Sequence, residues 1–195
     1  MADRYTYPNS PVLRNKLNVV DQSSLDRLEH GLVELALADL LRKPEAPTFR
    51  LEHLKAIHRR LFSELYEWAG TLRETDKAAR GSSRMHVRPE FLESAADDVF
   101  AALEAENFLT GLDQASFAPA LARHWGALAA LDPFRHGNIC SQAVLLDQMA
   151  TQAGWNVNWK ALDPDWIKEA RMAAAAGDPG LLAKLISPAL TSFPA

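Results

Sequence analysis

Cysteine is almost absent from this sequence. The single cysteine, Cys140, excludes an internal disulfide and is typical of a protein in a reducing compartment. No apolar run approaches the ~18 residues of a membrane span, and the N-terminus has no apolar signal-peptide core. These absences predict a cytoplasmic protein that has no membrane partner.

A large excess of charge of either sign is also lacking. The formal net charge is -4 at pH 7, from 21 Lys and Arg residues against 25 Asp and Glu residues, and this balance does not favour a nucleic-acid partner. The length of 195 residues and the 48% share of hydrophobic residues suit one globular domain with a sizeable core. We therefore expect a single domain over residues 1–195, with no linker or internal repeat.

Strand-like alternation is rare in the chain, whereas apolar residues recur at helical spacing almost throughout. The exception is the segment from Gly70 to Pro89, where a small hairpin within residues 71–88 is the one strand candidate. Ser23 and Ser24 are expected to cap the first helix. Proline and glycine at the segment ends place helices at about residues 25–42, 51–66, 89–103, 115–131, 139–153, 163–175 and 179–190.

The most informative stretch covers residues 131–143 and reads Leu-Asp-Pro-Phe-Arg-His-Gly-Asn-Ile-Cys-Ser-Gln-Ala. It resembles the signature loop of the Fic (Fido) family, which usually reads His-Pro-Phe-Xaa-Asp/Glu-Gly-Asn-Gly-Arg-Xaa-Xaa-Arg. The matching positions, in order and spacing, are Pro133, Phe134, Gly137 and Asn138. The resemblance implies an all-α Fic fold with a short flap hairpin or loop. Similar segments at residues 7–17, 57–73, 88–91 and 153–164 extend it over nearly the whole chain.

The residues that carry the family's chemistry differ here. The resemblance places Asp132 at the catalytic histidine, and His136 at the acid that binds Mg²⁺. The phosphate-holding Gly and two Arg correspond to Ile139, Cys140 and Ala143. An Asp is a weak general base at neutral pH, and Mg²⁺ prefers oxygen ligands to imidazole. The family's usual transfer of AMP from ATP to a protein hydroxyl, with ATP and Mg²⁺ as cofactors, is therefore expected only as a residual activity.

Three functions stay open at this point. The leading one is a divergent Fic-fold enzyme in which Asp132 and His136 transfer protons in chemistry other than standard AMP transfer. The first alternative is a catalytically inactive pseudo-Fic regulator or adaptor that binds a nucleotide or a protein partner. The second is residual adenylyltransferase activity. No metal site and no certain cofactor are expected.

Cys140 is a further candidate. It is expected in the first turn of the helix that follows the loop, where the helix N-terminus and a nearby His136 would lower the pKa of its thiol. Asp132 would then orient His136, giving the nucleophile, base and orienter pattern. The alternative is that Cys140 is a small buried apolar residue.

Residues expected to bind a substrate or anion come from the loop and the flap. In the loop they are Phe134, Gly137 and Asn138, because the turn presents backbone N–H groups. In the flap, Arg73 and Lys77 begin a basic run that includes Arg80, Arg84 and Arg88. This run either forms an edge for an anion or a target, or is a solvated loop. A small-molecule or protein substrate is expected under the flap, whereas the isolated histidines are expected to be structural: His58, His86 and His124.

Overall fold

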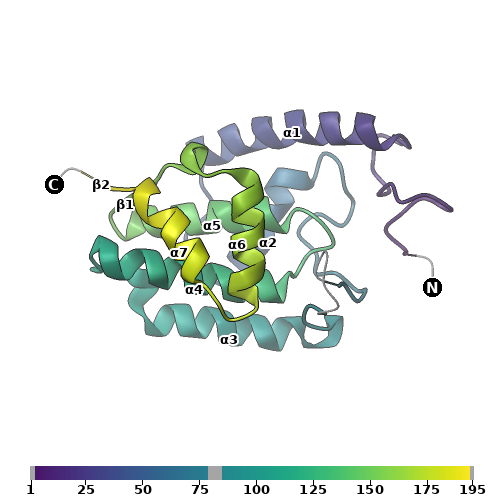
Figure 1. Cartoon of the computed structure of the whole chain (residues 1–195). Helices are drawn as coiled ribbons and strands as arrows, with labels where there is room; N and C mark the ends of the chain where they lie inside the picture. The colour runs from purple at the N-terminus through teal and green to yellow at the C-terminus, as the bar shows by residue number, and fades with distance from the viewer. Residues whose placement is uncertain (1–2, 79–84, 194–195) are drawn as a thin grey trace.

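The computed structural model describes residues 3–78 and 85–193, which fold into one helical body with little sheet (Figure 1). This confirms the all-α prediction. The helices are α1 (Gln22–Arg42), α2 (Leu51–Phe62), α3 (Leu92–Ala105), α4 (Gln114–Leu131), α5 (Asn138–Gln152), α6 (Pro164–Ala175) and α7 (Gly180–Ile186). Short 3-10 turns lie at Pro89–Phe91, Asn107–Leu109, Trp159–Ala161 and Ser187–Ala189.

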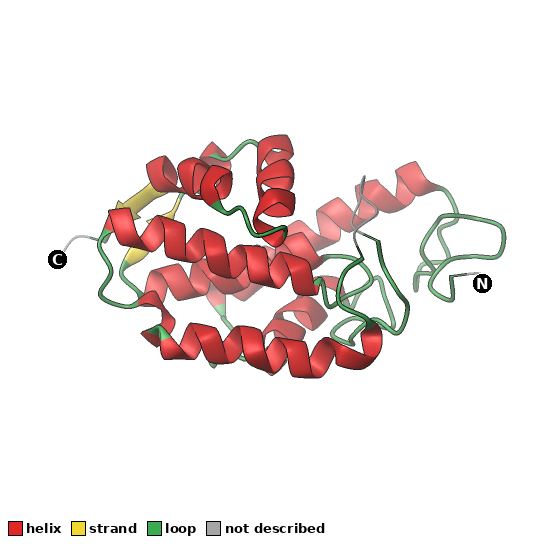
Figure 2. Cartoon of the chain, turned by 60° about the horizontal axis from the view of Figure 1, so that its bottom comes forward, coloured by secondary structure: helices red, strands yellow, loops and turns green. Residues whose placement is uncertain are grey.

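Two three-residue strands, β1 (Trp155–Val157) and β2 (Leu190–Ser192), pair antiparallel, with Trp155 opposite Ser192. The sequence did not predict this pair, because three residues are too few to show alternation. Figure 2 shows the strand pair at one end of the helical body, near the C-terminus, and the long loops gathered at the other end.

Helices α4 and α5 form the centre of the fold. Helix α5 packs on α2 and α4, while the other side of α4 packs on α6 and α7. Gly126 of α4 allows the close approach to α6, because a Cβ at that position would lie 2.8 Å from the backbone of Ala174. The apolar face of α5 is buried through Val144, Leu145, Leu146, Met149 and Ala150.

The N-terminal half departs from the sequence prediction in three places. The cap of α1 is Asp21, whose carboxylate accepts the Ser24 N–H at 2.8 Å, rather than the two serines. Leu35 continues the helical apolar spacing of Leu28 and Leu32, which predicts burial, but it is 71% exposed. Helix α2 ends at Phe62 rather than near residue 66, because the Leu65 N–H donates to the Phe62 carbonyl three residues back rather than to the Leu61 carbonyl.

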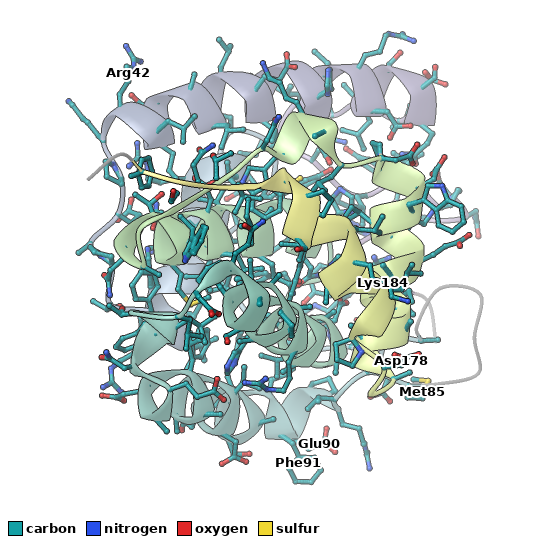
Figure 3. All side chains as sticks on the ribbon, turned by 60° about the vertical axis from the view of Figure 1, so that its left-hand side comes forward. Arg42, Met85, Glu90, Phe91, Asp178 and Lys184 are labelled. Carbon is teal, nitrogen blue, oxygen red and sulfur yellow. The ribbon has the colours of Figure 1, made fainter. Side chains whose placement is uncertain are left out.

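Two later helices also differ from their predicted bounds. The segment at 89–91 is a 3-10 turn, and Phe91 projects outward from it with 55% exposure (Figure 3). Helix α7 ends at Ile186 rather than Leu190, since Pro188 has no N–H to continue the helical hydrogen bonds. Helices α4, α5 and α6 begin and end within one residue of the predicted bounds.

The flap is the predicted hairpin within residues 71–88, and its stem is formed by Lys77 and Ala78 on one side and Met85 and His86 on the other. Ala78 and Met85 form an antiparallel bridge, and the His86 N–H donates to the Lys77 carbonyl at 3.0 Å. Residues 79–84 between them, which include Arg80 and Arg84, lie outside the described residues. In the part of the chain that the structure covers, no helix is both long and apolar enough to cross a membrane.

The loop between α4 and α5 is anchored by His58 of α2. The His58 ring is fully buried and stacks on Phe134, with 3.9 Å between ring centroids. Its Nδ1 accepts the Gly70 N–H at 2.8 Å, so the proton lies on Nε2, which donates to the His136 carbonyl at 3.0 Å. The structural role predicted for His58 therefore consists of holding the loop on α2.

This arrangement requires a neutral His58, and burial lowers its pKa from 6.5 to about 4. As pH falls, the unfolded chain binds this proton first, so stability is lost between about pH 6.5 and pH 4. We expect this group alone to reduce the free energy of unfolding by about 3 kcal/mol across that window. Urea unfolding at several pH values measures the loss. The variant His58→Gln should lack it, whereas His30→Gln, at an exposed histidine of α1, should keep it. Parallel profiles for wild type and His58→Gln would contradict this assignment.

Candidate functional site

The loop at residues 132–137 has the frame that its motif predicts. Asp132 ends α4 in a left-handed conformation with φ 43°, and Gly137 begins α5 with φ 78°. Asn138 closes the turn, since its Oδ1 accepts the Phe134 N–H at 2.9 Å and its Nδ2 donates to the Phe134 carbonyl at 2.7 Å. The side chains of Phe134 and Asn138 are buried in holding the turn, rather than placed to bind a ligand as expected.

Arg73, like Phe134 and Asn138, has a structural role in this region. It was expected at an anion-binding edge, but it is only 2% exposed. Its Nε donates to the Asp132 carbonyl at 2.9 Å and its guanidinium also donates to the carbonyls of Thr75 and Val87. Its backbone N–H donates to the Pro133 carbonyl at 2.9 Å. Arg73 therefore ties the flap to the loop.

A cleft of about 700 Å³ opens over this loop. One wall comes from α1, and the rest comes from Phe62 of α2, the flap stem, the loop, the first turn of α5 and α6. The ionisable side chains that line it come from all of these elements except α2: Asp26, Glu29, His30, Glu34, Lys77, His86, Asp132, Arg135, His136, Cys140, Lys168 and Arg171.

His136 forms a short hydrogen bond across this cleft. Its Nε2 lies 2.6 Å from Oε1 of Glu29 on α1, and its side chain remains 42% exposed. The second carboxylate oxygen of Glu29 accepts the Tyr66 hydroxyl at 2.5 Å. The result is a chain of hydrogen bonds from Tyr66 through Glu29 to His136. The other ring nitrogen of His136, Nδ1, takes no part in this chain.

The pKa shifts of Glu29 and Tyr66 keep the negative charge of this hydrogen-bond chain on Glu29. Burial would raise the pKa of Glu29, but the hydrogen bond and charge of His136 and the hydroxyl of Tyr66 hold it below its usual value. Burial and the charge of Glu29 raise the pKa of Tyr66. Glu29 is therefore an anion at neutral pH that accepts from both neighbours, and it orients the His136 ring.

Asp132 has different partners. Its carboxylate forms an ion pair with Lys77 at 2.5 Å and lies 4.0 Å from His86. His86 itself donates from Nδ1 to the Ala130 carbonyl at 3.3 Å. The expectation that Asp132 orients His136 was wrong, because Glu29 holds that imidazole. Lys77, expected to bind an anion, neutralises Asp132 instead.

Cys140 lies in the first turn of α5, as predicted, and it is exposed rather than buried. Its thiol nevertheless has an unfavourable environment for ionisation. Partial removal from water and the charge of Glu29 raise its pKa, and the attraction of Arg171 does not reverse this. The structure therefore does not provide the low pKa that the nucleophile hypothesis requires.

Two residues of the cleft were missed in the sequence. Glu29 lies four residues after the buried Leu25, on the inner side of α1. Arg171 lies four residues after the buried Ile167 on α6 and is itself 4% exposed. The available signal was a charged residue on the buried side of a predicted helix, because such a group needs a partner in the fold.

No group of three or more metal-ligating side chains gathers in the described ranges. The two motif positions that could have contributed ligands are engaged elsewhere, Asp132 with Lys77 and His136 with Glu29. The residues at the cleft therefore fit poorly with the Mg²⁺-dependent chemistry that the usual Fic motif implies.

Comparisons with known proteins agree with the motif resemblance. The Fic/DOC family matches residues 48–150. The "Probable protein adenylyltransferase Fic" of Escherichia coli (strain K12) is 31% identical over 90% of this chain and 86% of its own length. "Protein adenylyltransferase VbhT" of Bartonella schoenbuchensis is 33% identical over 98% of this chain, which spans only 40% of that larger protein.

Solved structures show the same fold. The BepC protein of Bartonella tribocorum, crystallised with bound AMPPNP, superposes with a TM-score of 0.90 at 22% identity over 97% of both chains. An N-terminal Fic domain from Bartonella quintana with bound ADP superposes with a TM-score of 0.89 at 22% identity over 96% of this chain and 94% of its own. These likenesses confirm the helical fold that the loop motif implied.

Gly137 should be the least replaceable residue of the loop. An added Cβ would combine a positive φ with a position 2.4 Å from the ring of Phe62. Gly154 also has a positive φ, but a Cβ there would meet open space. We expect Gly154→Ala to lower the free energy of unfolding by about 1–2 kcal/mol. Gly137→Ala should cost a further 1–3 kcal/mol for the clash. Denaturant unfolding of both variants checks this, and equal losses would contradict it.

The raised pKa of Cys140 predicts a slow thiol. Alkylation by iodoacetamide at pH 7 should be no faster than that of a small reference thiol, because little of Cys140 is thiolate. His136→Ala should leave the rate within about twofold, since the imidazole is held by Glu29. A faster reaction that His136→Ala slows would restore the nucleophile hypothesis.

Proposed function

Because the chain belongs to the Fic/DOC family, we propose that it is a Fic-fold group-transfer enzyme whose general base is His136, oriented by Glu29. The observation that carries the proposal is the 2.6 Å hydrogen bond between these residues at an open cleft. The curated relatives are named adenylyltransferases, which supports transfer to a hydroxyl as the ancestral reaction. In this chain, proton transfer has moved from position 132 to position 136.

The proposed mechanism uses the second nitrogen of the ring. Glu29 accepts the Nε2–H, so Nδ1 carries the lone pair and takes the proton of a substrate hydroxyl in the cleft. The hydroxyl oxygen then bonds to an electrophilic carbonyl or phosphoryl centre, the bond to the leaving group breaks, and His136 returns the proton to that group. Glu29 stabilises the imidazolium between the two transfers. The role of Asp132 is to hold Lys77, and with it the stem of the flap, at the edge of the cleft.

Standard AMP transfer with Mg²⁺ is a poor fit to these residues. To neutralise the charge of a triphosphate, a site needs a ligand for a metal ion and several cationic side chains. His136 replaces the acid, while Ile139, Cys140 and Ala143 replace the phosphate-holding residues of the motif. We propose that adenylyl transfer survives at most as a residual activity, and that ATP and Mg²⁺ are not the principal cofactors.

A second function is favoured by one observation. The Lys77 and Asp132 ion pair joins the flap stem to the position of the family's catalytic base. A chain that binds a nucleotide or protein partner without turnover would retain such a closure. This pseudo-Fic regulator or adaptor is the alternative that the next experiment distinguishes.

The test compares variants in an extract of small molecules from the source cells, with product detected by mass spectrometry. His136→Ala should reduce product formation by about 10²–10⁴-fold, the usual contribution of a general base. Glu29→Gln should reduce it less, because a Gln can still accept the Nε2–H but carries no charge. Asp132→Asn should retain activity within about tenfold. The control is Glu93→Gln, at an exposed carboxylate of α3.

Parallel incubations with labelled ATP, Mg²⁺ and a cell lysate address the other functions. Little labelled protein is expected. Strong labelling that Asp132→Asn abolishes and His136→Ala spares would show an adenylyltransferase with an Asp base. A complete lack of His136-dependent product in the extract would favour the pseudo-Fic alternative.

A further inference from the structure

Arg171 is a buried cation whose presence the proposed mechanism does not explain. It extends from α6, is 4% exposed and lines the same cleft as His136 and the first turn of α5. Its guanidinium donates to Oε1 of Gln142 at 2.7 Å, and it lies 5.5 Å from the ring centroid of Trp125. Both neighbours are neutral, although a buried charge is normally paired with an opposite charge.

Arg171 lacks such a partner in the described part of the chain. No carboxylate forms an ion pair with it, and its buried Nε has no hydrogen-bond acceptor. The attraction that it feels comes through space from Asp132 and Cys140, and the first of these is already paired with Lys77. Burial lowers the pKa of Arg171 only to about 10, so it carries its charge at pH 7.

The remaining cations of the cleft divide into two groups. Lys77 and Arg135 are paired with Asp132 and Asp3. Lys168, one helical turn before Arg171 on α6, is exposed and forms no ion pair among the residues described. One buried and one exposed cation on α6 therefore face the cleft without a carboxylate partner.

The first turn of α5 supplies complementary donors. The opening N–H groups of a helix have no acceptors within it and attract anions. Residues 137–140 line the cleft together with Arg171. The motif positions at 140 and 143 have lost their positive charge, since they are Cys140 and Ala143. A cation from α6 thus lies beside the helix N-terminus that those positions would otherwise serve.

We propose that Arg171, with the exposed Lys168 and the first-turn amides of α5, binds one oxyanion group of the substrate, a phosphate or a carboxylate. A guanidinium pairs with either group through two parallel N–H donors. One buried cation is suited to a single oxyanion rather than to a triphosphate. The inference rests on the proposed function, because the bound group would place a substrate hydroxyl or electrophile next to His136.

Calorimetric titration with inorganic phosphate and with acetate tests the site directly. Wild type should bind at least one of the two, and Arg171→Gln should weaken binding about ten- to a hundredfold, as loss of a charged hydrogen bond does. Arg171→Lys should lose less. The matched control is Lys184→Gln, which removes an exposed charge from α7 (Figure 3) and should bind as wild type does. Binding of phosphate alone identifies a phosphoryl group, and binding of acetate alone identifies a carboxylate.

A second measurement needs no variant of Arg171, whose removal from the core could unfold the protein. Cys140 lines the same cleft, so a bound anion should protect it from iodoacetamide. We expect saturable protection by phosphate or acetate, and none by chloride at equal ionic strength. Absence of both binding heat and protection would overturn the proposal.

The anion site and the proposed base can fail separately. His136→Ala should still bind the anion, because Arg171 and Lys168 remain. Anion binding without any His136-dependent product would support the site and count against the base. His136-dependent product from a protein that binds neither anion would count against the site alone.

Discussion

The stacking of His58 on Phe134, together with its hydrogen bond to the His136 carbonyl, fixes the loop on which every candidate group is placed. This contact joins α2 to the turn between α4 and α5, and Arg73 adds the flap through the Asp132 carbonyl. The anchoring groups are backbone carbonyls and a buried ring, so the frame tolerates changes in the outward side chains. That explains how the turn keeps its shape while its chemical residues differ from those of the family.

Two of the residues that differ from the family motif, Asp132 and His136, have charged partners on other elements. The aspartate at position 132 is paired with a flap lysine and the histidine at 136 with a carboxylate of α1, while a buried arginine of α6 lines the cleft beside the first turn of α5. Each partner comes from a different element, and all of them meet at one cleft. A chain that had merely lost its activity would not need an imidazole–carboxylate pair oriented at the cleft, because forming the pair costs desolvation of both groups.

Local signals predicted most of the fold. Helix α6 begins where Asp163 and Pro164 indicate, and α4 and α5 follow their apolar spacing. The first cap was misplaced because Asp21 and the serines after it are all good caps, and the strand pair joins residues 155 and 192, which no local pattern connects. The candidate site was likewise predicted only where a local motif marks it. The motif located Asp132, His136 and Cys140, but Glu29 lies 107 residues from His136 in the chain, and only the fold brings them together.

The central claim is that Glu29 accepts the Nε2–H of His136 and so leaves Nδ1 to act as the base. Nitrogen-15 NMR of the histidine side chains at pH 7 to 8 tests this directly, because the two ring nitrogens have distinct shifts in each tautomer. The account predicts the Nε2–H tautomer for His136, with a strongly downfield Nε2 proton that moves upfield in Glu29→Gln. A His136 ring that exchanges between tautomers, or one whose spectrum Glu29→Gln leaves unchanged, would contradict the account.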